Sequence, residues 1–329
     1  MKVSVIIPFF RVEKWIAACY ESLKAQTFKD FEVFFVDDGS DDGSRGVLED
    51  LIWRDSSADR FKVLILESNG GISIARNAGV RASSGEYIFF LDSDDRITPD
   101  ALEKLVALAE KYPGVDMVQG NCHPHHPSYD WMDISTCGFP EYSADREWIF
   151  TQFIHAHYDT SIPVTVWNKL IRRDLFIGEN MWFNGGSWHE DEHWRFTNAS
   201  KIESVAFCFD ITYLYTVREG SFMSDKFSSD RSPLTMLSYY KECFPKMPIY
   251  NRENIEDIAD YLIWAKKPDL IYHPVKYNWA YTKMSLSLAF GKSNFTPGLR
   301  KMCFYLALPP FLVSRKKARK MAFLLAFEA

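Results

Sequence analysis

The stretch GEYIFFLDSDDRITPDAL, residues 85–102, puts three carboxylates directly behind the most hydrophobic run of the chain. Residues 87–91 are apolar and read as a buried strand, Asp92, Asp94 and Asp95 follow, and Pro99 can open a helix. Carboxylates repel one another at the end of a buried strand. We therefore expect a positively charged group, such as a metal ion, to fill the space beside them.

The surrounding sequence alternates strand and helix patterns, which predicts parallel pairing and a doubly wound α/β sheet. In such sheets ligands bind beyond the carboxyl ends of the strands. Asp37 and Asp38 end one expected strand as the acidic cluster ends another, so both groups are expected to face one crevice. The expected strands are 3–9, 31–40, 61–66, 86–91 and 115–120, and the expected helices are 13–26, 45–54, 72–82 and 99–112.

The charge is unevenly distributed along the chain. The formal net charge is −6, yet residues 270–327 hold ten Lys or Arg and no Asp or Glu. This polarity favours an acidic body with a basic tail that meets an anionic surface, and the acidic body argues against nucleic-acid binding. The longest apolar run, 302–313, contains two prolines and is shorter than the roughly 18 residues that span a bilayer.

The six cysteines are scattered and show neither metal-ligand nor redox spacing. Met1 leads directly into a strand pattern, so no secretory signal is expected. Both observations favour free thiols in a reducing cytoplasm.

Each motif has a second interpretation. Asp92-Ser93-Asp94 could hold Mg²⁺ or cap the next helix, although Asp100 fits the cap better. The stretch VDDGSDDGS, residues 36–44, could be a solvated turn or could bind a ribose or base. Gly70 and Gly71 precede a helix and could face an anion, but they match neither a dinucleotide-binding nor a P-loop motif.

Taken together and in this order, the motifs resemble glycosyltransferase family 2, which has the GT-A nucleotide-diphospho-sugar transferase fold. The resemblance covers about residues 1–225. It is carried by VSVIIPFF, QTFKDFEV, VDDGSDDGS, NGGISIARNAG, GEYIFFLDSDD, VWNKLIRRDLF, HEDEHW and YTVREGS.

The resemblance implies a fold of a Rossmann-like, mostly parallel sheet with a helical C-terminal extension. Residues 1–120 form the half that binds the nucleotide sugar, and 121–230 form the acceptor half with the catalytic base. Residues 231–329 form a helical region with a basic tail that associates with the membrane.

The resemblance also assigns roles on the donor side. Asp38 holds the uracil and ribose, with Pro8 and Phe9 lining the base pocket. Asp94 binds Mn²⁺ or Mg²⁺ with Asp92 beside it, while Asp95 is the family's more variable position. The other implied contacts to the nucleotide sugar are Arg76, Asn77, Asp92 and Ser93.

On the acceptor side, the resemblance makes Asp191 the general base and Glu190 its neighbour, since a positioned carboxylate can take the proton of a sugar hydroxyl. His189 or His193 could be a third metal ligand, but a hydrogen-bonding role fits better. Lys169 and Arg218 could each neutralise the leaving diphosphate or be surface cations.

The expected enzyme is an inverting hexosyl- or N-acetylhexosaminyltransferase. It would move one sugar from a UDP-sugar to a glycan or glycolipid of lipopolysaccharide, O-antigen or capsule biosynthesis. Single addition is expected because the Q-x-x-R-W motif of processive synthases and membrane spans are not found. The expected location is the inner face of the cytoplasmic membrane. The alternatives are a nucleotidyltransferase on a similar sheet and an inactive glycan- or lipid-binding protein.

Overall fold

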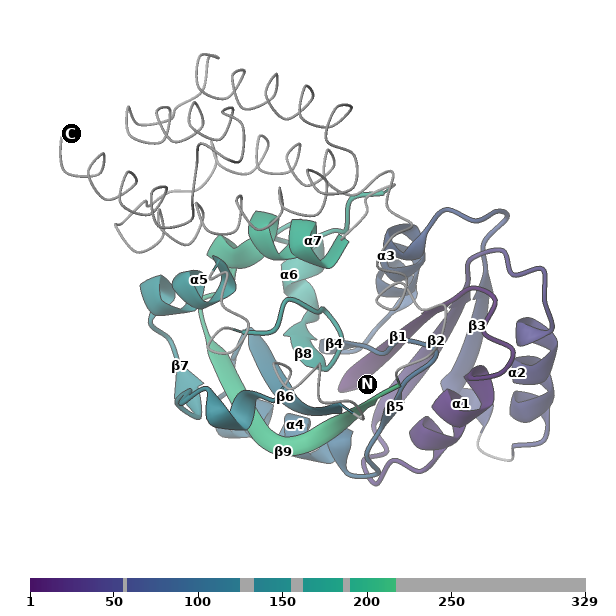
Figure 1. Ribbon diagram of the computed structural model, residues 1–329, viewed down its shortest axis with the longest axis horizontal. Coiled ribbons are helices and arrows are strands. Elements are labelled where there is room, and N and C mark those ends of the chain that lie inside the picture. The colour runs from purple at the N-terminus through teal and green to yellow at the C-terminus, as the bar shows by residue number, and fades with distance from the viewer. Residues whose placement is uncertain (56–57, 125–132, 155–161, 186–189, 217–329) are drawn as a thin grey trace, which may run out of the picture. The chain divides into compact units, whose positions relative to one another are not determined.

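The computed structural model describes residues 1–55, 58–124, 133–154, 162–185 and 190–216 (Figure 1). The chain divides into two units, one of Met1–Phe150 with Tyr158–Phe227, the other of Thr151–His157 with Ser228–Ala329. The second unit lies almost entirely outside the described residues. The expected helical region 231–329 and its basic tail therefore stay predictions.

The first unit is built on one sheet with the strand order β3-β2-β1-β4-β8-β6-β9-β5, and β7 pairs with β9. The strands are β1 (Val3–Phe9), β2 (Phe31–Asp37), β3 (Phe61–Ile65), β4 (Tyr87–Phe90), β5 (Arg96–Ile97), β6 (Met117–Pro124), β7 (Tyr142–Ser143), β8 (Lys169–Arg172) and β9 (Val205–Tyr215).

The amino-terminal part of the sheet is the parallel arrangement that the sequence predicts. β1 pairs in parallel with both β2 and β4, and β2 pairs in parallel with β3. All residues of β1, β2 and β4 are buried, as continuous apolar runs covered on both faces should be. β3 is at the edge and only one of its residues is buried.

The other part of the sheet is mixed. β8 lies between β4 and β6 and runs antiparallel to both, and β9 pairs in parallel with β6. The fifth strand expected from the sequence is therefore real, as β6, but it is separated from β4 by a later segment. The sheet remains mostly parallel and α/β, as predicted.

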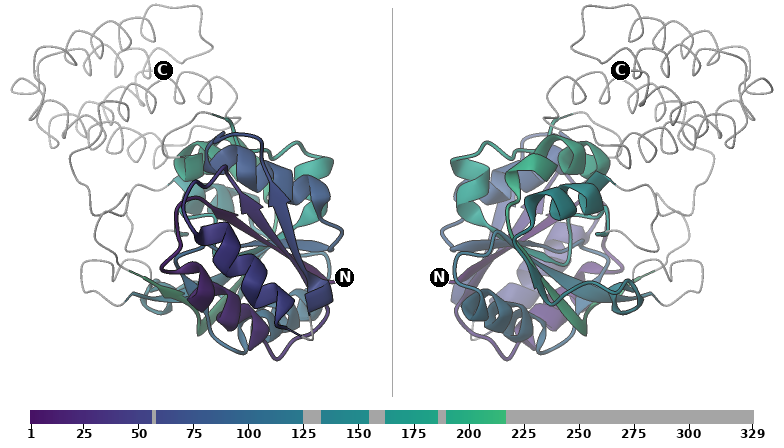
Figure 2. Two further views of the ribbon diagram at one scale, coloured as in Figure 1. Left: turned by 90° about the vertical axis from the view of Figure 1, so that its right-hand side faces the viewer. Right: turned by 90° about the vertical axis from the view of Figure 1, so that its left-hand side faces the viewer.

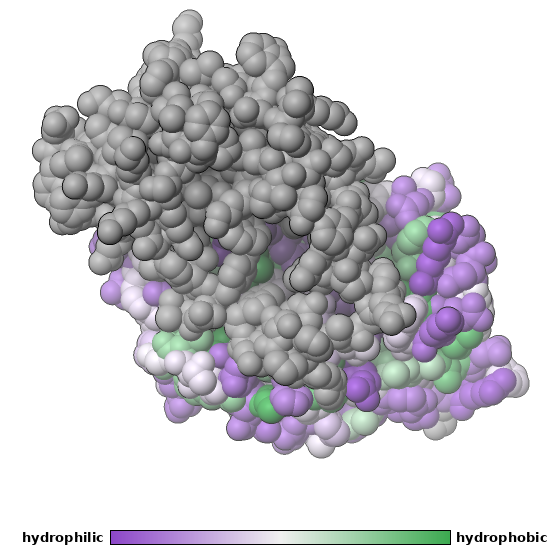
Figure 3. Space-filling view, viewed as in Figure 1, coloured by the Kyte–Doolittle hydropathy of each residue, from purple (hydrophilic) through white to green (hydrophobic). Residues whose placement is uncertain are grey.

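Helices cover both faces of the sheet in Figures 1 and 2, with α1, α2 and α4 on one side and α3, α6 and α7 on the other. The exposed surface near α1 and α2 is largely hydrophilic (Figure 3), as the outer faces of amphipathic helices should be. The helices are α1 (Ile16–Lys24), α2 (Ser44–Trp53), α3 (Ile72–Ala82), α4 (Ala101–Lys111), α5 (Arg146–Ile154), α6 (Arg173–Ile177) and α7 (Glu190–Asn198).

Gly79 lets helix α3 pack closely against the sheet. A Cβ atom on Gly79 would come within 2.3 Å of Ile6 Cγ2 in β1. Arg76 is one turn earlier on the same helix face, since residues three apart are neighbours on a helix. The glycine therefore helps to hold Arg76 against the carboxyl end of the sheet.

Two further expectations can be compared with the described residues. Cys19, Cys122 and Cys208 carry free, buried thiols. No helix within the described ranges is long and apolar enough to cross a membrane.

Candidate active site

The two acidic groups that end β2 and β4 lie at the same edge of the sheet. Phe9 of β1 is in register with Asp37, and Ile6 is in register with Phe90 of β4. Because the three strands are parallel neighbours, their carboxyl ends meet there. This confirms that the acids share one edge.

The centre of the site is Arg76, whose side chain is 1% exposed. Its Nη2 is 3.2 Å from Asp92 Oδ1, and its Nη1 is 2.8 Å from Glu190 Oε1 and 2.9 Å from Asp191 Oδ1. The guanidinium thus joins the acid after β4 to both acids that open α7. Asp92 and Asp191 are 99 positions apart in the sequence but share one cation.

This crowding changes the protonation equilibria. Burial raises the pKa of Asp92 to about 6, the charges of Asp94 and Glu190 act in the same direction, and Arg76 opposes them. Burial also raises the pKa of Asp191 well above its ordinary value, opposed by Arg76 and reinforced by Glu190 and Asp92. Although burial opposes it, the three carboxylates raise the pKa of Arg76. Arg76 therefore stays charged, and Asp191 is a stronger base than an ordinary aspartate.

The second oxygen of Asp191 contacts the chain just before β8. Oδ2 accepts a hydrogen bond from the backbone N–H of Val166 at 3.3 Å. Each carboxylate oxygen has two acceptor lone pairs, so both retain capacity for a further proton or hydrogen bond.

Lys169 does not lie on the surface, so its interpretation as a surface cation is wrong. It is 1% exposed, and its ammonium donates to the carbonyl oxygens of Pro163, at 3.0 Å, and of Thr165. Burial lowers its pKa to about 7, although the charge of Asp191 opposes this.

Both carboxylate oxygens of Asp38 accept hydrogen bonds from the loop before α3. Its Oδ1 accepts from the Gly70 N–H and its Oδ2 from the Gly71 N–H, both at 2.8 Å. Burial raises its pKa, and these two N–H groups oppose the shift. Any contact from Asp38 to a nucleotide would use the remaining lone pairs, so its expected role stays a prediction.

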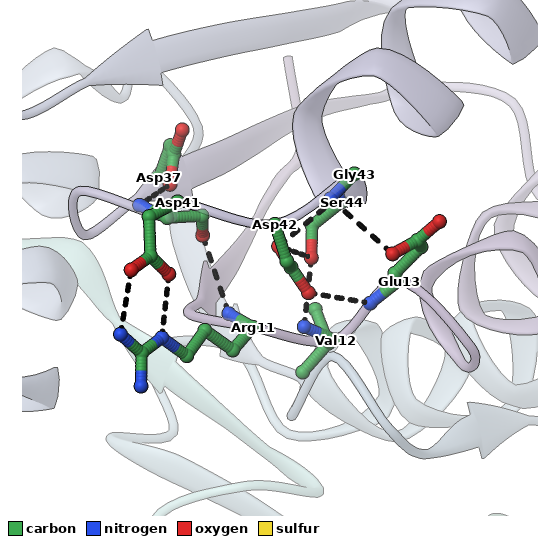
Figure 4. A network of polar contacts seen from close by, with 9 residues as sticks. Arg11, Val12, Glu13, Asp37, Asp41, Asp42, Gly43 and Ser44 are labelled. Atoms are coloured by element: carbon green, nitrogen blue, oxygen red, sulfur yellow. Dashed lines mark hydrogen bonds and ion pairs between the residues drawn. The ribbon is translucent and has the colours of Figure 1, made fainter.

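The other acids of residues 36–44 tie two loops together (Figure 4). The Arg11 Nε and Nη2 atoms each lie 2.6 Å from an Asp41 oxygen, and Asp37 accepts from the Ser40 N–H at 2.8 Å. Asp42 accepts from the Glu13 N–H at 3.4 Å. For these three acids, the turn interpretation is the one the geometry supports.

At the end of β1 the structure distinguishes two neighbouring phenylalanines. Phe9 is 2% exposed, whereas Phe10 is 37% exposed, and Arg11 lies over the Phe10 ring at 4.9 Å. A base can stack only on an accessible ring, so Phe10 is the better candidate for the base pocket. The sequence alone gives no signal that singles out Phe10.

Other predicted residues have mainly internal contacts. Asn77 donates from Nδ2 to the Phe183 carbonyl at 2.8 Å and accepts from the Phe183 N–H at 3.0 Å. Pro8 and Ser93 are buried. Arg218 and His189 lie outside the described residues.

Asp94 and Asp92 offer carboxylate oxygens, the ligand type that a hard divalent cation prefers. Asp94 is half-buried, and the Asp92 side chain is 25% exposed. Asp95 is different, because its oxygens accept from the Tyr213 hydroxyl and the Thr216 N–H, both at 2.7 Å. The crowding that raises the Asp92 pKa is what a bound cation would relieve.

Among the described residues, which include His193 of α7, no group of three His, Cys, Asp or Glu side chains could hold a metal ion. Mg²⁺ usually takes one or two protein carboxylates and completes its sphere with phosphate oxygens and water. Two aspartates therefore suffice for a metal that arrives with a diphosphate.

Residues 4–178 match the family model described as "Glycosyl transferase family 2". The chain is 29% identical over 291 residues to "Uncharacterized glycosyltransferase EpsJ" of Bacillus subtilis, covering 82% of this chain and 77% of the relative.

Two solved structures share the fold. S. aureus TarS 1-349 in complex with UDP-GlcNAc has a TM-score of 0.63 at 19% identity, covering 99% of this chain and 90% of TarS. The mannosyltransferase PcManGT from Pyrobaculum calidifontis, in complex with GDP-Man and Mn²⁺, has a TM-score of 0.55 at 14% identity, covering 99% and 86%.

Proposed function

This chain belongs to glycosyltransferase family 2, and we propose that it moves one sugar from a UDP-sugar to a hydroxyl of a glycan or glycolipid, with inversion. As a family 2 enzyme it transfers a sugar from a nucleotide sugar. The family match favours this activity over the nucleotidyltransferase and the inactive binding protein considered from the sequence.

The observation that carries the proposal is the shared cation Arg76. It contacts Asp92, next to the expected metal-binding residue Asp94, and also Asp191, the expected base. A donor whose diphosphate lies at the strand end would therefore sit close to a carboxylate able to take a proton from the acceptor. Transfer needs these two groups on either side of the anomeric carbon.

In the proposed step the acceptor oxygen attacks the anomeric carbon, and its proton passes to Asp191. The bond between the anomeric carbon and the diphosphate oxygen breaks, and UDP leaves with that electron pair. The raised pKa of Asp191 favours proton acceptance. Glu190 and Arg76 orient the Asp191 carboxylate through their common contact.

Asp94 and Asp92 are the proposed metal ligands. When bound, Mn²⁺ or Mg²⁺ supplies positive charge that stabilises the leaving diphosphate. Phe10 is the proposed stacking surface for the base, and Asp38 with Gly70 and Gly71 shapes the neighbouring loop.

The UDP donor is proposed because TarS carries UDP-GlcNAc, whereas PcManGT carries GDP-Man. A panel of UDP- and GDP-sugars, assayed for nucleotide release with Mn²⁺ and again with EDTA, tests this. We expect release from a UDP-sugar that EDTA abolishes. Release only from GDP-sugars would overturn the donor assignment, and unchanged release in EDTA would overturn the metal.

The basic segment 270–327 supports an acceptor at an anionic membrane surface, as in the assembly of lipopolysaccharide, O-antigen or capsule. Near an anionic leaflet each Lys or Arg contributes on the order of 1 kcal/mol. The full chain should sediment with anionic liposomes at low salt, and a chain ending at Leu308 should not. A full chain that ignores such liposomes would contradict the proposal. The segment lies outside the described residues.

A further inference from the structure

Lys169 is a buried cation whose hydrogen bonds go to the chain just before it. Its Nζ is 3.0 Å from the Pro163 oxygen and also donates to the Thr165 oxygen. Asn168 has a φ of 57°, a left-handed turn at the entry to β8. The turn and these two hydrogen bonds hold segment 163–166 against the first residue of the strand.

The carbonyl of Thr165 and the N–H of Val166 belong to the same peptide unit. Lys169 donates to the oxygen end of this unit, and its N–H end donates to Asp191 Oδ2 at 3.3 Å. A peptide unit is planar and stiff, so fixing one end fixes the direction of the other. Hydrogen bonds in series also polarise one another in a low-dielectric interior.

We propose that Lys169 is a positioning residue for the general base, acting on Asp191 through the peptide unit between Thr165 and Val166, and is not a ligand of the donor diphosphate. The proposal rests on the proposed role of Asp191. It replaces the expectation that Lys169 neutralises the leaving group.

The burial of Lys169 supports this role. A group that neutralises a diphosphate must present its charge to the ligand, yet Lys169 is 1% exposed and spends donors on two carbonyls. Loss of its proton would still leave an amine with two N–H donors for the same carbonyls. The peptide unit would therefore stay in place in either protonation state.

Several other charged groups act on Asp191 and Lys169, and they determine how a substitution of Lys169 changes the pKa of Asp191. Arg76 of α3, Glu190 of α7 and Asp92 after β4 act on Asp191, and Arg195 of α7 acts on Lys169. Within the described ranges, Lys169 thus acts on the base as a second positive charge beside Arg76. Removing it should raise the pKa of Asp191, because a nearby positive charge favours the carboxylate form.

The test compares Lys169→Met, Lys169→Gln and Lys169→Arg in the full-length protein, each alone and combined with Asp191→Asn. The probe reaction is the hydrolysis of UDP-GlcNAc, which is monitored through the UDP released. UDP affinity is measured by calorimetry. Arg172→Met is the matched control, since Arg172 is in the same strand but pairs with Asp116 at 3.0 Å. GDP-mannose is the second donor probe.

Lys169→Met should lower kcat by roughly ten- to a hundredfold, the cost of a misplaced catalytic group. UDP affinity and the KM for the donor should stay within about twofold of the wild-type values, because the substitution removes no contact to the bound donor. The acid limb of the kcat/KM profile should move to higher pH. Lys169→Arg should restore most of the rate, and Arg172→Met should change none of these quantities.

Three outcomes would overturn the proposal. Weaker UDP binding with little change in kcat would make Lys169 a donor ligand. If Lys169→Met lowers kcat by the same factor in the Asp191→Asn background as in the wild type, the two residues act independently, and Lys169 would be merely structural. If Lys169→Met does not fold, Lys169→Leu, which also lacks an N–H donor, is compared with Lys169→Arg, and equal kcat for these two would contradict the proposal.

A result of a different kind separates this proposal from the proposed function. If Asp191→Asn keeps full activity, the assignment of the base is wrong. The backbone amide proton of Val166, followed by NMR without metal or donor, then tests the peptide link alone. Its resonance should move in Lys169→Met and not in Arg172→Met, and an unmoved resonance would refute the link.

Discussion

Glu32 at the amino edge of the sheet and Asp92 at its carboxyl edge have pKa values that are shifted in opposite directions. At the amino edge, Glu32 Oε1 accepts from the Ser4 hydroxyl at 2.8 Å and from the Ser84 N–H and hydroxyl, each at 2.7 Å. Its Oε2 is 2.8 Å from Lys62 Nζ. At the carboxyl edge, Asp92, Glu190 and Asp191 all contact the guanidinium of Arg76.

The difference lies in the number of donors per carboxylate. Burial acts to raise the pKa of Glu32, yet the bonds from Lys62, Ser84 and Ser4 lower it to about 2. The pKa of Asp92 instead rises to about 6, because burial and neighbouring acids outweigh one guanidinium. The amino edge thus stabilises the fold, while the carboxyl edge holds excess negative charge ready for a proton or a cation.

The largest effect should come from removing a carboxylate at the crowded edge. Asp94→Ala should reduce turnover on the order of 10³-fold or more, since a catalytic metal supplies several kcal/mol of charge stabilisation. UDP binding should lose its dependence on Mn²⁺, as calorimetry with and without EDTA can show. The melting temperature should not fall, because the variant relieves repulsion. Near-normal turnover in EDTA would contradict the metal assignment.

The second prediction tests whether Asp191 at the carboxyl edge acts as the general base or belongs to the nucleotide pocket. Asp191→Asn keeps the shape of the side chain but removes its basicity, and loss of a general base costs roughly 10²–10⁴-fold in rate. Steady-state kinetics should show this loss in kcat with donor affinity nearly unchanged. If donor affinity fell sharply while kcat held, Asp191 would belong to the nucleotide pocket instead.

The sequence predicted the amino-terminal part of the fold well because its signals are local. The apolar runs of β1, β2 and β4 and the helix at 72–82 were all recognisable from pattern, and α3 spans Ile72–Ala82. β8 was not predicted as a strand, because it has four residues and begins with a buried lysine. Its insertion between β4 and β6 depends on contacts far apart in the sequence.

The candidate site was predicted residue by residue, but its connections were not. The motifs identified Asp92, Arg76 and Asp191 separately, and no spacing shows that one guanidinium joins them. The resemblance implies Phe9 for the base pocket, and because β1 is buried on both faces, alternation gives no sign of whether the Phe9 or the Phe10 ring is accessible. Burial of Lys169 likewise depends on the carbonyls of segment 163–166, which no side-chain pattern reports.

The third prediction concerns a substitution at the amino edge of the sheet, which leaves the carboxyl edge unchanged. Glu32→Gln should lower the free energy of unfolding by about 1–3 kcal/mol at neutral pH, because it removes a buried charged acceptor. The contribution of Glu32 is fully present above pH 4.5 and is lost as pH falls toward about 2. Urea unfolding of both proteins should therefore give a difference that shrinks across this range. Kinetic constants should match the wild type, and altered turnover would contradict the separation of roles.

The smallest expected effect concerns Glu190, which lies beside Asp191 at the carboxyl edge of the sheet. Glu190 and Asp191 contact the same Nη1 of Arg76 at 2.8 and 2.9 Å, and the charge of Glu190 contributes to the raised pKa of Asp191. Glu190→Gln removes that charge and leaves Arg76 with fewer competing partners. The pKa of Asp191 should therefore fall, so the acid limb of the kcat/KM profile should move to lower pH. The rate at the plateau should fall less than in Asp191→Asn, because the base remains. Glu32→Gln is the control, since it removes a buried carboxylate from the opposite edge and should leave the limb in place. A limb that moves to higher pH, or moves equally in both variants, would show that Glu190 does not set the basicity of Asp191.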